Sequence, residues 1–282
     1  MPRPSPCRLS VFLSRRSPVG VLLRRGPSAW AQLIHWERTS DAFTPGQWFH
    51  GRVYERRCDL SPDGRLFVYF AAKHGRRQRD DDIGEAWTAV SRPPYFTALC
   101  LWENAGSWYG GGVFRTDRKL ELDATCSLTP HEGYSAGPLK LAAMAGSTAP
   151  WEQRLLRDGW VLVERGFEPR NYRRVGEREI WRKGHPDGKL ALLQQPKDVD
   201  FRRYGGFYGS AYWLERGDER LPIKGAMWVD WESRERLIAV RRGALYEIDM
   251  ATGELAAQPF FDPNPLQPET LPAPEWATRW PR

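Results

Sequence analysis

Short apolar, β-prone stretches alternate with turn-forming residues along most of the chain. Two of the turns contain the sequence Pro-Asp-Gly, at 62–64 and 186–188, where glycine accepts a positive φ without steric cost. The flanking stretches have strand lengths and strand compositions. The pairs of predicted strands are 58–60 with 65–70, 96–102 with 107–114, 179–181 with 189–193, and 227–231 with 236–240. The pattern predicts many short strands joined by tight turns.

One region shows the repeating unit in full. Four strand candidates follow one another at 228–231, 237–241, 244–248 and 254–257. They are separated by the short polar stretches 233–235, 242–243 and 249–253. Such a succession predicts a four-stranded antiparallel meander.

The turns recur at a nearly constant spacing. Gly26 and Gly64 are 38 residues apart, Gly64 and Gly106 are 42 apart, and Gly188 and Glu235 are 47 apart. The 82 residues between Gly106 and Gly188 are twice 41, so one repeat near position 147 is degenerate or replaced by its helical flanks. A period of about 40–45 residues with four short strands is typical of a propeller blade. We therefore expect an all-β, β-propeller-like fold with five or six short four-stranded blades.

Two stretches carry a family resemblance. Residues 60–69, LSPDGRLFVY, resemble the SPDG turn of TolB-like and WD40-like propellers, and 245–254 are similar to their outer hairpin. The resemblance covers about 48–72 and 220–258. It implies a propeller fold but leaves the function open, since propellers serve as scaffolds, lectins and hydrolases.

The chain is expected to divide into three parts. Residues 1–18 are a basic segment that could include a first strand, 19–258 are the propeller-like domain, and 259–282 are a proline-rich, extended tail. Within the domain, the charged stretch 73–86 is expected to be a loop. A helical insertion is expected at 138–159, with Ser147 or Thr148 as its cap, Pro150 in its first turn and Gly159 at its end.

The positive charge is concentrated at one end of the sequence. The net charge is +7, and the first 36 residues contain six arginines and no acidic residue, so the remainder carries 36 basic against 35 acidic residues. A nucleic-acid binder usually carries its excess charge on the folded body. Nucleic-acid binding therefore stays an alternative function, using the run 170–183 and four arginines: Arg15, Arg16, Arg24 and Arg25.

The sequence indicates a cytoplasmic protein. It has no run of 18 apolar residues, which disfavours a membrane span, and its early apolar stretch 19–23 is too short for a secretory core. Free thiols at Cys7, Cys58, Cys100 and Cys126 agree with this location.

No familiar catalytic or metal-binding motif is present. There is no Cys-x-x-Cys, His-x-x-x-His or Gly-x-Ser-x-Gly, and residues 109–112 (YGGG) lack the Lys-Ser/Thr ending of a phosphate loop. We expect no metal and no cofactor. An enzyme of glycosidase or hydrolase type stays an alternative, in which carboxylates converge in a central pocket. The candidate carboxylates are Asp59, Asp123, Asp200 and Asp230.

Aromatic and arginine side chains near turns are the candidates for ligand binding. The chain has 14 tryptophans. We expect those in predicted strands to pack in the core (Trp36, Trp102, Trp181, Trp228 and Trp231) and those near turns to be exposed (Trp48, Trp108 and Trp151). Two Tyr-Gly-Gly triplets, at 109–111 and 204–206, either leave space for a ligand or let backbones approach closely. The Arg92–Tyr95 turn (RPPY) either presents binding anchors or is simply a rigid turn. The candidate ligand-binding residues are Arg92, Tyr95, Trp108, Tyr109, Tyr204 and Tyr208.

These features predict a non-catalytic binding or scaffold module. The module is expected to recognise a protein or another ligand, with a protein favoured, through a rigid rim of arginine and aromatic side chains.

Overall fold

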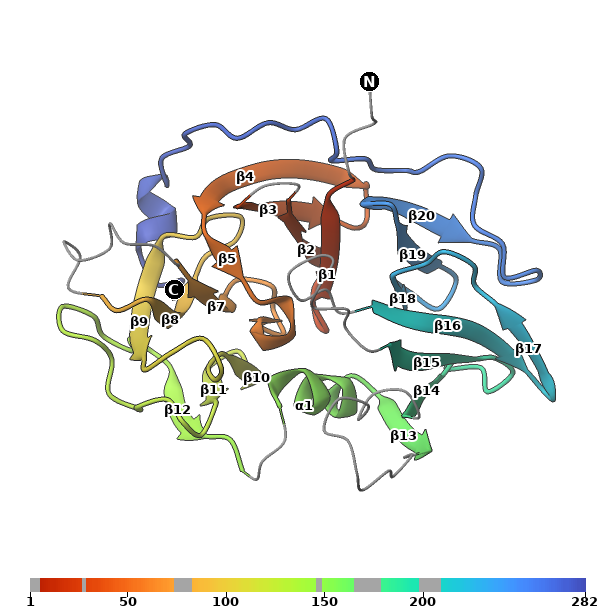
Figure 1. Ribbon diagram of the computed structural model, residues 1–282, viewed down its shortest axis with the longest axis horizontal. Coiled ribbons are helices and arrows are strands. Elements are labelled where there is room, and N and C mark those ends of the chain that lie inside the picture. Colours follow the sequence, from red (N-terminus) through yellow and green to blue (C-terminus); the bar gives the residue numbers. More distant parts are fainter. Residues whose placement is uncertain (1–5, 27–28, 74–82, 146–148, 165–178, 198–208) are drawn as a thin grey trace. The chain divides into compact units, whose positions relative to one another are not determined.

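The computed structural model confirms an all-β, β-propeller-like fold with five small sheets and one α-helix in the described residues (Figure 1). The structure describes residues 6–26, 29–73, 83–145, 149–164, 179–197 and 209–282. The sheets contain three to five strands, so the expectation of four strands in every blade was too regular. The chain forms two compact units, one of residues 1–154 and 266–282 and the other of residues 155–265.

The first sheet of unit 1 is a simple antiparallel meander. It consists of β1 (Arg8–Leu13), β2 (Val19–Arg25), β3 (Trp30–Glu37) and β4 (Ala42–His50), paired in sequence order. Three successive residues of β2, at 21–23, are fully buried, so both faces of this strand are covered. This explains why β2 is a continuous apolar run rather than an alternating one.

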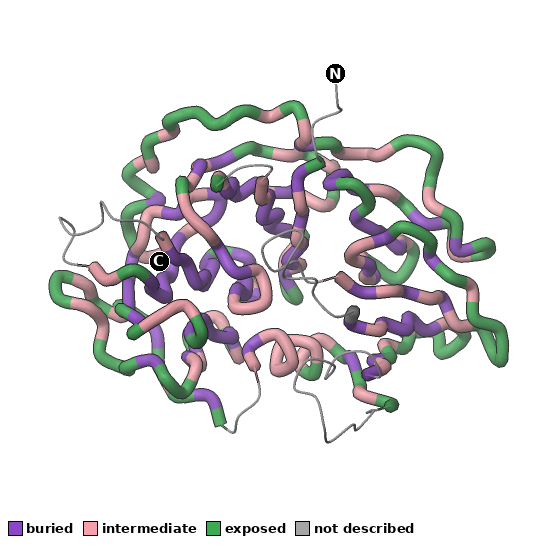
Figure 2. The backbone as a smooth tube through the Cα atoms, viewed as in Figure 1, coloured by how far each residue is buried: buried purple, intermediate pink, exposed green. Residues whose placement is uncertain are grey.

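The second sheet is the most deeply buried. It pairs β5 (Arg52–Val53), β7 (Phe67–Ala72), β8 (Ala86–Ser91) and β9 (Ala98–Asn104), and β6 (Asp59–Leu60) also pairs with β7. A short 3-10 helix, η1 (Glu55–Arg57), joins β5 to β6. Every residue of β7 and β8 is buried (Figure 2).

The third sheet differs from the sequence prediction. It contains β10 (Gly112–Thr116), β11 (Lys119–Leu122) and β12 (Lys140–Ala143), and β12 is parallel to β11. The turn counting placed one repeat at Gly106, between the predicted strands 96–102 and 107–114, and a degenerate one near 147. The predicted strand 107–114 is also incorrect over most of its length, because 105–111 form a loop that leads from β9 to another sheet.

The helix that follows lies within the predicted insertion 138–159. Helix α1 (Pro150–Arg157) begins at Pro150, as expected. Gly159 follows it with a φ of +89°, a conformation that favours glycine after a helix. The proposed caps Ser147 and Thr148 lie outside the described residues, as do 74–82 of the charged stretch.

Unit 2 contains two antiparallel meanders. The first has five strands, β13 (Trp160–Glu164), β14 (Ile180–Gly184), β15 (Ala191–Lys197), β16 (Gly209–Arg216) and β17 (Glu219–Pro222). The second has three, β18 (Trp228–Trp231), β19 (Leu237–Arg241) and β20 (Ala244–Ile248). The predicted fourth strand at 254–257 is reduced to a single bridge between Ile248 and Leu255.

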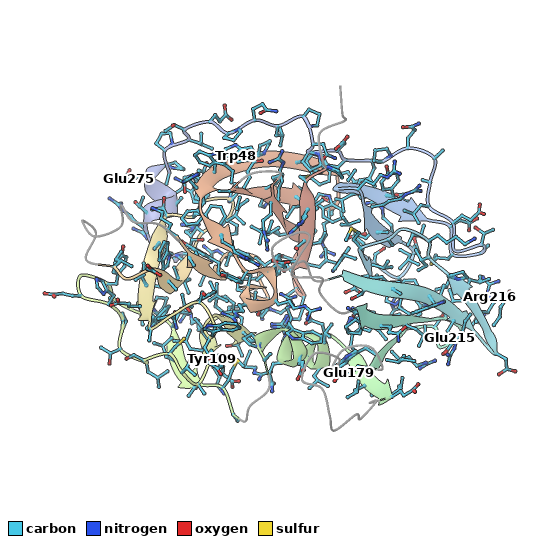
Figure 3. All side chains as sticks on the ribbon, in the orientation of Figure 1. Trp48, Tyr109, Glu179, Glu215, Arg216 and Glu275 are labelled. Atoms are coloured by element: carbon cyan, nitrogen blue, oxygen red, sulfur yellow. The ribbon has the colours of Figure 1, made fainter. Side chains whose placement is uncertain are left out.

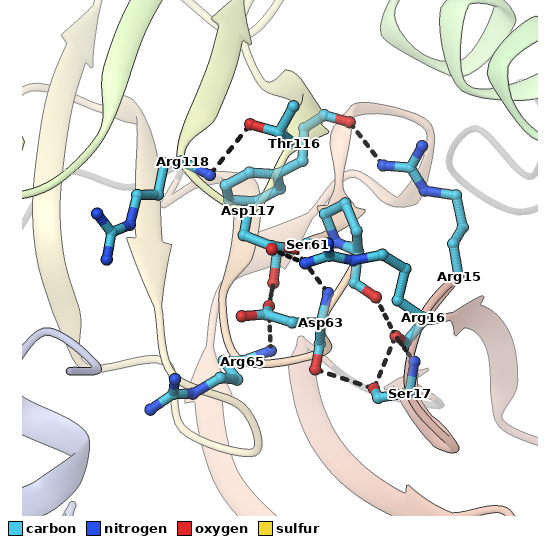
Figure 4. Close-up of polar contacts among 12 residues, drawn as sticks. Arg15, Arg16, Ser17, Ser61, Asp63, Arg65, Thr116, Asp117 and Arg118 are labelled. Carbon is cyan, nitrogen blue, oxygen red and sulfur yellow. Dashed lines mark hydrogen bonds and ion pairs between the residues drawn. The ribbon is translucent and has the colours of Figure 1, made fainter.

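The SPDG turn forms as predicted and holds two other turns of unit 1 (Figure 4). Gly64 adopts a φ of +76° and its amide donates to Ser61 O at 2.9 Å. Ser17, in the turn between β1 and β2, donates through Oγ to Asp63 O at 2.9 Å. The Asp63 amide donates to Oδ1 of Asp117 at 3.0 Å, in the turn between β10 and β11. Three sheets are thus tied together through their hairpin turns.

The tryptophans mostly follow the prediction. Trp36, Trp102, Trp181 and Trp231 are buried, and Trp228 is partly buried. Trp48 was expected to be exposed, but it is buried beneath the guanidinium of Arg24, whose Cζ lies 4.7 Å from the ring centroid. Its position in β4 gives it a covered face that proximity to a turn does not reveal.

Residues 266–282 run along unit 1 beside β4 and contain a second 3-10 helix, η2 (Glu275–Thr278) (Figure 1). They belong to none of the sheets described above. In the part of the chain described, no helix has the length and apolar character needed to cross a membrane.

Candidate functional site

The two most exposed large aromatic side chains of the described residues are neighbours in one loop. Trp108 is 81% exposed and Tyr109, labelled in Figure 3, is 62% exposed. Both belong to residues 105–111, which connect β9 to β10 and are called the aromatic loop below. Exposed aromatic side chains of this size are characteristic of binding surfaces.

The side chain of Arg57, in η1, is hydrogen-bonded to the backbone of this loop. One guanidinium nitrogen donates to Ser107 O at 2.8 Å, and the other donates to Trp108 O. The same guanidinium lies over two rings of the core, with its Cζ 5.2 Å from the Tyr54 centroid and 4.8 Å from the Phe70 centroid. These contacts orient Arg57, and Arg57 in turn orients the loop.

Two glycines bring the loop close to the core. Gly110 and Gly111 have φ values of +130° and +87°. A Cβ at Gly110 would lie 2.4 Å from Cδ2 of Phe70, and one at Gly111 would lie 2.2 Å from the carbonyl oxygen of Arg57. The first Tyr-Gly-Gly triplet therefore serves close backbone approach, one of the two interpretations offered by the sequence. The second triplet, 204–206, lies outside the described residues.

A buried chain of polar groups anchors the end of the loop. The Gly111 amide donates to Thr88 Oγ1 at 2.8 Å, and that hydroxyl donates to Asn104 Oδ1 at 3.0 Å. Asn104 Nδ2 then donates to Cys126 Sγ at 3.1 Å. Burial raises the pKa of the Cys126 thiol, so it stays protonated near neutral pH. Gly111, Thr88, Asn104 and Cys126 thus satisfy one another's hydrogen-bonding groups.

Alkylation of Cys126 should report local opening of the aromatic loop. Burial also raises the pKa values of Cys58 and Cys100, each to about 12, so all three thiols should react slowly with iodoacetamide at pH 8. Asn104→Leu removes the hydrogen bond to Cys126 and should accelerate its labelling by about tenfold, since local opening needs less free energy than global unfolding. Mass spectrometry of the peptides measures all three sites, with Cys58 and Cys100 as internal controls. Equal acceleration at all three would show global loosening and contradict a local anchor.

Arg92 and Tyr95 are placed at the other end of β9. They lie in the turn that joins β8 to β9, whereas the aromatic loop leaves the far end of β9. The Tyr95 amide donates to Arg92 O at 3.0 Å, so these residues do form a turn. Both side chains contact Trp276: Arg92 Cζ lies 4.8 Å from a Trp276 ring centroid, and the Tyr95 ring packs edge-on at 5.4 Å.

The six candidate ligand-binding residues therefore do not form one described site. Trp108 and Tyr109 share the aromatic loop, Arg92 and Tyr95 share the turn at the opposite end of β9, and Tyr204 and Tyr208 lie outside the described residues. Sequence reasoning missed three contributing residues. Arg57 and Trp276 are described above, and the third is Gln47, whose Oε1 accepts from the Phe96 and Thr97 amides beside the Arg92–Tyr95 turn. Trp276 had a usable signal, because it is a large aromatic residue among prolines. The roles of Arg57 and Gln47 depend on distant contacts and leave no mark in the local sequence.

The candidate carboxylates have local structural roles. Asp59 Oδ2 accepts from the Phe114 amide at 2.8 Å, and Asp123 Oδ1 accepts from Thr125 Oγ1 at 2.7 Å. In unit 2, Asp230 pairs with Lys183 at 2.6 Å; burial raises the pKa of Asp230, and the lysine partly opposes that shift. Asp200 lies outside the described residues. Among the described side chains, no group of three or more His, Cys, Asp or Glu is placed to hold a metal ion.

The N-terminal arginines also bind within the protein. Arg15 donates to Phe114 O at 3.1 Å, Arg16 pairs with Asp117, and Arg25 pairs with Glu55. Arg24 is buried against Trp48. Four of the six arginines in the first 36 residues therefore have partners within the protein.

No family model matches the chain, and no curated protein matches it. A propeller-like fold alone is compatible with many functions, so the function depends on the side chains of the site.

Proposed function

We propose that this protein is a non-catalytic binding module that recognises a protein partner through the aromatic loop. The observation that carries the proposal is the adjacent pair Trp108 and Tyr109, exposed on a backbone that Arg57, Gly110 and Gly111 fix in place. Propeller-like folds commonly present such loops from a rigid scaffold.

The physical advantage of this arrangement is preorganisation. Binding costs free energy when side chains and loops become ordered, and a loop that is already fixed avoids most of that cost. Tryptophan and tyrosine offer large contact areas with only two side-chain torsions each. They are also the residue types that most often dominate the binding free energy of protein interfaces.

The chemistry of the loop favours a protein over a nucleic acid. Residues 105–111 (AGSWYGG) contain no charged side chain, and the nearby Arg57 guanidinium faces backbone carbonyls of the loop. A nucleic-acid surface would place cations where they meet phosphates. Depletion of charge around aromatic anchors is instead typical of the core of a protein interface. A cytoplasmic location remains part of the proposal and rests on the buried free thiols of Cys58, Cys100 and Cys126.

The test compares wild-type protein with the variant Trp108→Ala/Tyr109→Ala. Each is used as bait in extract from the native host, and captured proteins are quantified by mass spectrometry. We expect a partner that the wild-type protein captures and the variant does not, with a Kd for the purified partner weakened by about 100-fold. The melting temperature should be unchanged, since both side chains are mostly exposed.

The matched control is Leu128→Ala. Leu128 is 43% exposed in the same unit, so this variant removes exposed apolar surface without touching the aromatic loop. It should capture the partner as wild type does. Full retention of every captured protein by the double variant would contradict the proposal.

A further inference from the structure

The segment 266–282 contacts the rest of unit 1 in an unusual way for a part of an all-β fold. It contributes no strand to the sheets described, and side chains of unit 1 hold it instead. Gln47 Nε2 donates to Leu271 O at 3.0 Å, and Arg92 Nη1 donates to Trp276 O at 2.6 Å. Arg24 and Arg65 donate in the same manner, to Leu266 O at 3.0 Å and to Arg282 O at 2.8 Å. These four side chains are called the carbonyl track below.

The four acceptors named above are main-chain oxygens of the segment. The segment contains four prolines, at 268, 272, 274 and 281. Proline lacks an amide hydrogen but keeps its carbonyl, so proline-rich chains stay extended and present carbonyls to side-chain donors. Recognition of this kind is how aromatic-lined grooves bind proline-rich peptides.

Two tryptophans give the contact its side-chain specificity. Trp276 packs against Arg92 and Tyr95 and remains 46% exposed, as expected for a side chain resting on the surface. Trp280 lies against Gly137, where a Cβ would approach its ring to 2.4 Å, and it contacts the core cluster beneath. Glu275, labelled in Figure 3, lies at the start of η2 beside Trp276. The segment thus presents the sequence Pro-x-Trp at 274–276 and a second tryptophan four residues later, at 280.

One donor of the track, Gln47, is also held by residues outside the segment. Gln47 Oε1 accepts from the Phe96 amide at 2.8 Å and from the Thr97 amide at 3.1 Å. These bonds fix the side-chain amide and turn Nε2 toward Leu271. The loop that positions Tyr95 therefore also positions the donor for the segment, which makes the site preorganised.

We propose that the carbonyl track, together with the ring of Tyr95, is a peptide-binding site. Its ligand is an extended, proline-rich peptide with tryptophans in the spacing of Trp276 and Trp280, and residues 266–282 occupy it within the same chain. A peptide of the same chemistry competes with this resident segment. The surface is separate from the aromatic loop, because the two lie at opposite ends of β9.

The experiment uses the full chain with Trp276→Ala and a fluorescent synthetic peptide of sequence 266–282. The resident segment competes at an effective concentration of about millimolar, so wild-type protein should bind the peptide weakly. Loss of the Trp276 contact weakens that competition, and we expect peptide affinity to rise by about tenfold or more. A peptide that itself carries Trp276→Ala should not bind, and adding Arg92→Ala to the Trp276→Ala chain should abolish binding.

Glu275→Ala is the matched control. Glu275 is exposed next to Trp276, and its ion-pair partner, Arg279, lies in the same segment. The Glu275→Ala chain should therefore bind the peptide with the affinity of the wild-type chain. Equal affinities for the Trp276→Ala and wild-type chains would overturn the proposal. Unfolding of the Trp276→Ala chain would overturn it as well, since the segment would then be an inseparable part of the core.

Hydrogen exchange of the wild-type chain tests the same point without a substitution. The Ala277 amide, which donates to Pro274 O at 2.8 Å, should exchange at least about 100-fold faster than amides of the buried strands β7 and β8. Exchange of Ala277 only through global unfolding would contradict a displaceable segment.

Discussion

Gly111→Ala is expected to destabilise the protein by about 2–4 kcal/mol and to abolish partner binding by the aromatic loop. Gly111 has a φ of +87°, and a Cβ there would lie 2.2 Å from Arg57 O and 2.6 Å from Arg57 Cβ. The first atom belongs to the backbone of η1, so the clash cannot be relieved by turning a flexible side chain. Either the loop moves away from Arg57 or η1 shifts.

Both responses break the same contacts. Arg57 would lose its hydrogen bonds to Ser107 O and Trp108 O, and the Gly111 amide would leave Thr88. The exposed aromatic pair would then sit on an unanchored loop, and ordering it would cost free energy on binding. Urea unfolding measures the stability, and the partner's Kd measures the function.

Gly106→Ala is the control from the same loop. Gly106 is outside the left-handed region and has open space around its Cβ position. Its unfolding free energy should change by less than about 0.5 kcal/mol, and partner binding should be retained. If the two alanine variants behaved alike, the close approach at Gly111 would not be what orders the loop.

The difference between these glycines shows what sequence alone could supply. The recurrence of turns correctly predicted the fold class because a hairpin turn is a local event, decided by residues such as Asp63 and Gly64. The same reasoning did not place β12, since this strand joins β11 in parallel after a long connection. Parallel pairing of that kind leaves no turn signal between the two strands.

For the candidate site, the sequence indicated the exposed aromatic residues but not the contacts made by the arginines. Trp108 and Tyr109 were identified from their own surroundings, a turn rich in glycine. The contact of Arg92 with Trp276 joins residues 184 positions apart, so a single sequence cannot indicate that this arginine is already engaged within the chain. Arg57 and the aromatic loop are likewise about 50 residues apart, and their contact appears only once η1 and the loop are folded.

Asp59→Ala is expected to lower the free energy of unfolding by about 2–3 kcal/mol. Asp59 is 1% exposed in β6, and its Oδ2 accepts from the Phe114 amide in β10, a strand of another sheet. Alanine would leave that buried amide without this acceptor, and a buried donor that loses its partner bears its full desolvation cost. Thermal and urea unfolding would measure the loss.

Two further variants separate the possible roles of the candidate carboxylates. Asp59→Asn keeps an acceptor oxygen for Phe114 and should recover most of the stability, which would show that the hydrogen bond matters more than the charge. Asp123→Ala removes a carboxylate that accepts from Thr125 in an exposed turn, and should cost less than about 1 kcal/mol. Unchanged stability in Asp59→Ala would mean that this buried carboxylate is not retained for the fold, and a chemical role for it would then regain support.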